Sequence, residues 1–168
     1  MFRTAAAPPG FVALCMHRPE LCRHSTNPEG RLVDDDRTEK LLSLINERVN
    51  SDITYEPDPR HYGVVNHWAL DAMGHQGDCK DYALAKRQVL LAVGFPDSAL
   101  RIAIARIPDG ELHAVLTVTT DRGIRVLDNL TSNTAWIDET PYHWIEWQSP
   151  DDPLRWLPMS DTFDSFLR

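Results

Sequence analysis

Residues 77–94 read GDCKDYALAKRQVLLAVG and predict the central helix of the fold. Gly77 and Asp78 stand where a helix begins, and Gly94 stands where one ends. Between these ends, apolar residues recur at helical spacing and form a buried side, at Ala83, Leu84, Ala85, Leu90 and Leu91. Because a helix with such a side must bury it, the rest of the chain has to supply a partner surface.

The residues after this helix predict that surface as an antiparallel sheet. Segments 100–107, 113–119 and 124–127 (LRIAIARI, HAVLTVT and IRVL) are strand-like, and the turn sequences PDG and DRG separate them. A fourth strand is expected at 142–148 (YHWIEWQ). Helices followed by an antiparallel meander are typical of α+β proteins. We therefore expect an α+β fold, with N-terminal helices and the central helix packed on an antiparallel sheet, in a single domain over residues 1–168.

The N-terminal part predicts helices and holds two close cysteines. Residues 37–50 show helical spacing, and residues 10–24 predict a short helix that Pro19 bends or interrupts. In one straight helix Cys15 and Cys22 would lie ~10.5 Å apart, whereas a disulfide needs Cα atoms ~4.4–6.8 Å apart. A bridge thus requires the break at Pro19, and both a bridge and two unpaired core cysteines stay open. Residues 52–74 predict a long ordered loop.

Composition and charge exclude several classes of protein. With 42% hydrophobic and 25% charged residues the chain lies in the globular range, which excludes wholesale disorder. The 17 basic and 25 acidic residues give a net charge of −8 and form no basic stripe of the kind that nucleic-acid binding needs. No apolar stretch approaches the ~20 residues that span a bilayer. We expect neither nucleic-acid binding nor membrane insertion.

Cys79 is the candidate nucleophile. It stands in the first turn of the central helix, directly after Gly77 and Asp78, where unpaired backbone N–H groups and the helix dipole favour negative charge. Since the thiolate is the reactive form of cysteine, a helix start suits a catalytic thiol. A buried structural cysteine gains nothing from the start of a helix over its middle.

Two residues of the predicted sheet complete the arrangement. His113 opens the second strand, and Asp128 ends the third. In an antiparallel hairpin with its turn near 120–123, these two residues lie almost opposite each other, with a mismatch of two positions. A carboxylate at that place can accept the imidazole N–H, fix its tautomer and stabilise the imidazolium. The chain order Cys79, His113, Asp128 therefore predicts a nucleophile, base and orienting group.

Each of these residues also has an ordinary structural explanation. A free cysteine is most often a small buried hydrophobe, a lone histidine at a strand start is most often solvated, and Asp128-Asn129 is typical of a turn. Asp128 and Asn129 point to opposite faces of the strand, so only one can orient His113, and we choose Asp128. A zinc site is disfavoured because no cysteine or histidine spacing fits a common finger.

The motifs resemble one family over nearly the whole chain. GVVNHWAL (63–70), GDCKDYALAKRQVLLAVGFP (77–96), HAVLTVTTDRG (113–123) and VLDNLT (126–131) are similar, in this order, to the bacterial transglutaminase-like cysteine peptidases. The head FVALCMHRPELC and the tail WIEWQSPDDPLRW resemble the family too, and G-D-C-x-D-Y is the most specific element. The resemblance implies a papain-like/transglutaminase-like core with Cys79 as nucleophile, His113 as base and Asp128 as orienter.

The same resemblance bears on the oxyanion site and on calcium. It puts the NHW segment near the nucleophile, so Trp68 and Asn66 are candidate oxyanion donors beside the backbone N–H of Cys79. The best-known branch is a calcium-dependent protease that trims cell-surface adhesins and so controls biofilm release; it carries an acidic residue directly after the nucleophile. Here that residue is Lys80, between Asp78 and Asp81. Replacing a carboxylate by a cation removes a calcium ligand and negative charge. We expect no required cofactor, with Asp78 and Asp81 as the only calcium candidates.

The leading functional hypothesis is a cysteine endopeptidase that hydrolyses a protein or peptide substrate, such as a cell-surface adhesin. Two alternatives stay open: transglutaminase-type acyl transfer to an amine, and a non-catalytic peptide-binding domain. The family resemblance implies export to the periplasm, although residues 1–10 (MFRTAAAPPG) lack the apolar core of a signal peptide, as a chain with a removed signal would. Whether a membrane receptor regulates the protein is left open.

Overall fold

The computed structural model describes residues 4–57, 67–70 and 72–159. Its longer helices are α1 (Pro9–His17), α2 (Asp36–Asp52) and α4 (Cys79–Ala92), and its short 3-10 helices are η1 (Pro19–Cys22), η2 (Asp97–Ala99) and η3 (Ile137–Glu139). The strands are β1 (Ala5–Ala6), β2 (Thr54–Tyr55), β3 (Gln76–Gly77), β4 (Leu100–Arg106), β5 (Leu112–Thr120), β6 (Gly123–Leu127), β7 (Ala135–Trp136), β8 (His143–Gln148) and β9 (Arg155–Pro158). Among the described helices, none is both long and apolar enough to cross a membrane.

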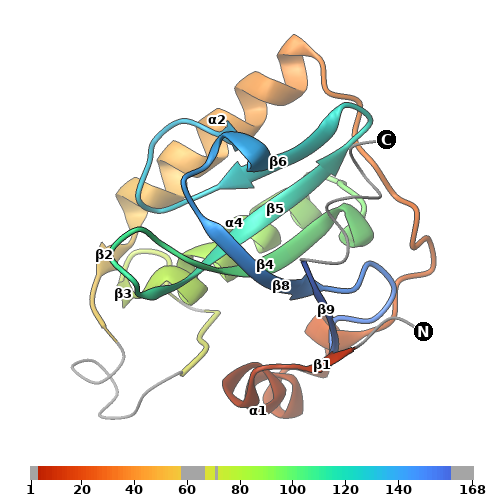
Figure 1. Ribbon diagram of the computed structural model, residues 1–168, viewed down its shortest axis with the longest axis vertical. Helices are drawn as coiled ribbons and strands as arrows, with labels where there is room; N and C mark the ends of the chain where they lie inside the picture. The colour runs from red at the N-terminus through yellow and green to blue at the C-terminus, as the bar shows by residue number, and fades with distance from the viewer. Residues whose placement is uncertain (1–3, 58–66, 71, 160–168) are drawn as a thin grey trace.

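The main sheet has the strand order β1-β9-β8-β4-β5-β6-β7, and its strand pairs are antiparallel. The antiparallel meander of β4, β5 and β6 forms its centre, with α4 behind it and α2 along one side (Figure 1). The expected α+β fold is confirmed, with helices packed on a mostly antiparallel sheet.

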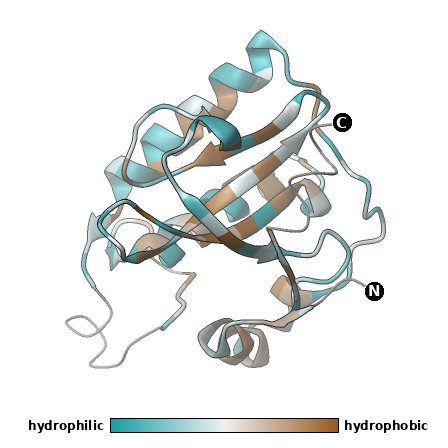
Figure 2. Cartoon of the chain, in the orientation of Figure 1, coloured by the Kyte–Doolittle hydropathy of each residue, from teal (hydrophilic) through white to brown (hydrophobic). Residues whose placement is uncertain are grey.

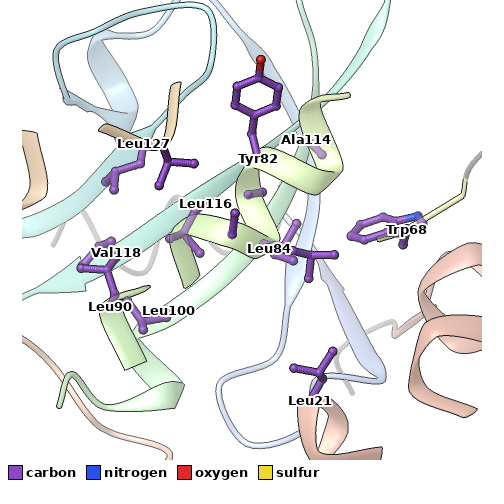
Figure 3. Close-up of a cluster of buried hydrophobic side chains, with 14 of the residues drawn as sticks. Leu21, Trp68, Tyr82, Leu84, Leu90, Leu100, Ala114, Leu116, Val118 and Leu127 are labelled. Carbon is purple, nitrogen blue, oxygen red and sulfur yellow. The ribbon is translucent and has the colours of Figure 1, made fainter. Parts of the chain in front are cut away.

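The core lies mainly between α4 and the central strands. Leu90 of α4, Leu100 of β4 and Leu116 of β5 are almost fully buried in this cluster, which Figure 3 shows. Burying a leucine side chain contributes ~1.5–3 kcal/mol, so this layer anchors the helix firmly on the sheet. The opposite face of the sheet carries a second cluster around Val115, Val126, Ile137 and Trp147. Figure 2 shows hydrophobic residues, in brown, along the strands of the sheet.

The N-terminal helices join the core through a disulfide and aromatic contacts. α1 ends before Arg18 and Pro19 begins η1, and this break brings the Cα atoms of Cys15 and Cys22 to 5.8 Å, where they form a disulfide. The ring of Phe11 packs edge-on against Trp68 with a centroid distance of 5.4 Å and against Trp156 at 6.3 Å. The N-terminal segment is thereby held against α4 and the last strand of the sheet.

The structure also contains elements that the sequence patterns did not predict. The edge strands β1 and β7, and β9 next to β1, are two to four residues long, too short to show an alternating pattern. Within the expected loop 52–74, β2 starts after α2 and pairs in parallel with β3, directly before α4. Residues 58–66 and 71 of that loop lie outside the described residues.

Candidate active site

The head of α4 explains every fixed residue of the G-D-C-x-D motif. Asp78 is the N-cap, and its side chain accepts a hydrogen bond from the Lys80 backbone N–H at 3.2 Å. Asp81 reaches back to the backbone N–H of Asp78 at 3.0 Å, which completes a capping box. A Cβ atom on Gly77 would lie 2.8 Å from the Asp81 Cβ atom, so only glycine fits there. Cys79 is thus held at the first position of the helix, half-buried.

Asp81 also ties the segment before α4 to the head of the helix. It is fully buried, and its Oδ1 atom accepts the backbone N–H of Ala69 at 2.8 Å while Oδ2 accepts that of Asp78. Burial raises the pKa of Asp81 to about 7, against these two hydrogen bonds, which lower it. Both carboxylate oxygen atoms of Asp81 therefore accept hydrogen bonds from the backbone.

The two carboxylates at the helix head, the calcium candidates from the sequence, both have partners within the protein. Asp78 forms a buried ion pair with the ammonium group of Lys80, and Asp81 has both oxygens on backbone N–H groups. A calcium ion would need six to eight oxygen ligands. In residues 4–57, 67–70 and 72–159, no group of three or more His, Cys, Asp or Glu side chains is arranged to hold a metal ion. Lys80 supplies the positive charge at this place.

The structure brings His113 and Asp128 into direct contact. The His113 Nε2 atom lies 2.7 Å from the Asp128 Oδ1 atom, and both side chains are buried. The β5–β6 register pairs Leu116 with Leu127, which would put Asp128 opposite Val115 rather than opposite His113. The expected mismatch of two positions is real. Because residues two apart on a strand share a face, the pair meets diagonally across the hairpin.

Asp128 has a third hydrogen-bond partner in addition to His113 and the loop that follows β6. Its Oδ1 atom accepts the Leu130 backbone N–H at 3.0 Å, and its Oδ2 atom accepts the Tyr142 hydroxyl at 2.5 Å. The ring of Tyr142 packs edge-on against the His113 ring, with a centroid distance of 5.9 Å. Sequence reasoning missed Tyr142. No local signal points to it, because residue 142 reaches Asp128 only through the course of the chain across the sheet.

Charges at this place favour a protonated imidazole. Burial alone would lower the pKa of His113, but hydrogen bonds to Asp128 and to the Cys79 side chain raise it to about 9. Burial also opposes the ionisation of Asp128, but the hydrogen bond and charge of His113 outweigh it and lower the Asp128 pKa. The arrangement can therefore hold an imidazolium between the Asp128 carboxylate and the side chain of Cys79.

The other candidates from the sequence have different outcomes. Trp68 is buried in the core, and its indole N–H has no hydrogen-bond partner among the described residues. Asn66 lies outside those residues. Asn129 takes no part in the contact with His113, which Asp128 makes.

With this geometry in view, comparison with known proteins identifies the family. The model of the bacterial transglutaminase-like cysteine proteinases matches residues 1–164. The chain belongs to this family. It is therefore a transglutaminase-like cysteine peptidase. No curated protein sequence matches the chain significantly.

Solved structures of LapG from Legionella pneumophila share the fold of this peptidase. The calcium-bound form is 23% identical, with a TM-score of 0.57 over 82% of this chain and 73% of that chain. The EGTA-treated form is also 23% identical, with a TM-score of 0.56 over 82% and 71%. A third LapG structure is 26% identical, with a TM-score of 0.54 over 75% and 77%. These structures show that the transglutaminase-like fold is common to both proteins.

Proposed function

We propose that this peptidase is an endopeptidase in which Cys79 is the nucleophile, His113 the general acid and base, and Asp128 the group that orients and charges the imidazole. The observation that carries the proposal is the chain of contacts from the thiol at the head of α4, through His113, to the buried Asp128 carboxylate. In such a chain Asp128 orients and charges His113, and His113 in turn activates the thiol of Cys79 for nucleophilic attack.

The reaction follows from these positions. The Cys79 thiolate attacks a peptide carbonyl, and His113 gives its proton to the leaving amine, which leaves a thioester on Cys79. His113 then takes a proton from water, whose oxygen attacks the thioester carbonyl; the C–S bond breaks, which releases the acid product and restores the Cys79 thiolate. The backbone N–H of Cys79, at the first helical position, is the donor we assign to the oxyanion. The indole N–H of Trp68, without a partner among the described residues, is the second candidate, because the neighbouring Ala69 backbone is bonded to the helix head.

A polypeptide substrate suits the surroundings of these residues. An exposed aromatic side chain lies beside the nucleophile: Tyr55 pairs with Gly77 directly before the helix. Burial raises the pKa of Tyr55, and so do electrostatic interactions with the nearby Cys79 and Asp78 side chains. Apolar side chains around a nucleophile offer contacts to the residues that flank a scissile bond.

We further propose the periplasm as the location and a cell-surface adhesin as the substrate class. The Cys15–Cys22 disulfide supports an oxidising compartment, where such bonds persist. The proposal of an adhesin rests on the family resemblance.

The test is cleavage of a synthetic peptide mixture, with new termini identified by mass spectrometry. Wild-type protein should produce new termini and the Cys79→Ala variant should not. A biotinylated primary amine in the same reaction detects acyl transfer. Amine-capped products without free carboxylates would overturn hydrolysis in favour of acyl transfer. Unchanged cleavage by Cys79→Ala would overturn the assignment of the nucleophile.

A further inference from the structure

Tyr142 reaches the site on the connection from β7 to β8. The segment from η3 to β8 connects β7, which pairs with β6, to β8, which pairs with β4. It crosses the sheet on the face away from α4, because Ile137 of η3 packs with Val115 and Val126 there. Figure 1 shows this connection passing in front of the central strands. Residue 142 thereby comes to lie against the ends of β5 and β6, where His113 and Asp128 stand.

The hydroxyl of Tyr142 is the hydrogen-bond donor to one oxygen atom of Asp128, while the other oxygen has two donors of its own. Oδ1 accepts hydrogen bonds from His113 and from the Leu130 backbone. Oδ2 accepts one from Tyr142 at 2.5 Å. A carboxylate held at only one oxygen can rotate about its Cβ–Cγ bond, and rotation would draw Oδ1 away from His113. The contact with Tyr142 opposes that rotation.

The direction of this hydrogen bond is fixed. A carboxylate only accepts, so the phenol must donate. Burial and the hydrogen bond to Asp128 raise the pKa of Tyr142, so the phenol keeps its proton. The pKa of Asp128 is lowered, so the carboxylate stays ionised. A charge-assisted bond of this kind is about twice as strong as a neutral one.

The aromatic ring of Tyr142 restrains the imidazole as well. It meets His113 edge-to-face at an interplanar angle of 79°, and it meets Trp144 at 61° with a centroid distance of 5.8 Å. Trp144 is in turn fixed by its indole N–H, which donates to the Ile137 carbonyl at 3.3 Å. Tyr142 is thus itself held in place from the other side.

We propose that Tyr142 is a positioning residue for this site, which holds Asp128 through its hydroxyl and confines His113 through its ring. The inference rests on the proposed roles of Cys79, His113 and Asp128. It assigns Tyr142 no contact with the substrate.

The test compares Tyr142→Phe with Tyr82→Phe. Each variant loses one hydroxyl and keeps its ring; the Tyr82 hydroxyl donates to the Ile53 carbonyl at 2.8 Å and touches none of the three site residues in the contacts of the described chain. The probe is iodoacetamide at pH 6, where an ordinary thiol is almost wholly protonated. Since Cys15 and Cys22 are bonded, Cys79 is the only thiol that reacts. Tyr142→Phe should slow alkylation about ten- to hundredfold, the worth of one hydrogen bond to a charged group, and Tyr82→Phe should leave it unchanged.

A spectroscopic readout separates positioning from general weakening of the fold. The His113 ring proton shared with Asp128 should give a far-downfield proton NMR signal in the wild type. In Tyr142→Phe this signal should broaden through faster exchange with water, while the melting temperature stays within a few degrees of that of Tyr82→Phe. A normal alkylation rate together with a sharp ring-proton signal in Tyr142→Phe would overturn the inference.

A double mutant tests whether Tyr142 acts through Asp128. In the Asp128→Asn background, Tyr142→Phe should slow alkylation less than about twofold, because the charged hydrogen bond is already gone and the Leu130 N–H still orients the amide. Additive losses would overturn the inference. If Asp128→Asn alone alkylates like the wild type, the proposed function fails. If Asp128→Asn is impaired and Tyr142→Phe is not, only the role of Tyr142 fails.

Discussion

Replacement of Asp128 by asparagine tests how the charge of this carboxylate acts on His113. In the structure the Oδ1 atom of Asp128 accepts hydrogen bonds from His113 and from the Leu130 backbone N–H, and its Oδ2 atom accepts one from the Tyr142 hydroxyl. The Leu130 N–H requires an acceptor, whereas the hydroxyl of Tyr142 can either donate or accept. We therefore expect the new amide side chain in Asp128→Asn to keep its oxygen on His113 and to turn its NH₂ group to Tyr142. The imidazole tautomer is then retained, and only the charge is lost.

The size of the effect follows from the loss of one ion pair. Opposite unit charges about 4 Å apart attract by about 4 kcal/mol at an effective dielectric constant of about 20. Because one pH unit of pKa corresponds to about 1.4 kcal/mol, the pKa of His113 should fall by roughly two to three pH units from its value of about 9. The same loss in the transition state slows cleavage about 10²- to 10³-fold. A rotated amide with the wrong tautomer would cost ~10⁴, as in a serine triad.

Two measurements check this expectation. NMR titration of the His113 ring gives its pKa in both proteins, and cleavage of a peptide found in the mixture assay gives the rate. Thermal melting supplies a third. The pKa of His113 is raised above its unfolded value of about 6.5, so its contribution to wild-type stability is full below about pH 6.5 and is lost as the pH rises through about 9. In Asp128→Asn that pH-dependent loss should shrink. An unchanged pKa of His113 in the variant would refute the reasoning.

Three further predictions concern the head of α4 and the N-terminal bridge. Cys79→Ala should fold normally and lose on the order of 10⁴–10⁶ in cleavage rate; a rate above about a tenth of wild type would rule out a cysteine nucleophile. Cys15 and Cys22 should be bonded in periplasm-derived protein, as mass spectrometry can show, and reduction should lower the free energy of unfolding by ~2–3 kcal/mol; two free thiols would remove the support for export. EGTA should leave activity and melting temperature nearly unchanged, and Lys80→Glu should create calcium sensitivity, because Lys80 neutralises Asp78; inactivation of the wild type by EGTA, reversed by Ca²⁺, would contradict this charge argument.

Much of the fold was predictable because local signals agreed with the tertiary arrangement. Turn residues marked both central hairpins, and alternating apolar residues marked β4, β5 and β6. The His113–Asp128 contact was predictable for the same reason, since a hairpin with a known turn fixes which residues meet. The expected mismatch of two positions proved to be the diagonal relation that puts both side chains on one face.

Other features were not predictable because they depend on contacts between distant segments. The short strands β9, β1 and β7 form only because β8, β9 and β6 offer them a strand to pair with. Within α4, Lys86 and Arg87 are buried although their residue types favour solvent. The helix packs against α2 as well as against β4 and β5, so little of its surface is exposed to solvent. Burial accordingly lowers the pKa of Lys86 to about 7.

The specificity of the G-D-C-x-D-Y motif comes from separate physical demands that meet in one turn of helix. Gly77 leaves room for Asp81, and Asp78 and Asp81 together accept the free backbone N–H groups at the start of the helix in a capping box. Tyr82 ties the same turn to the end of α2 through the Ile53 carbonyl. Each of these side chains is used for structure, and so is the ammonium of Lys80 on Asp78. Cys79 is the member of the turn whose side chain is left for His113, which is why the motif presents a reactive thiol rather than merely capping a helix.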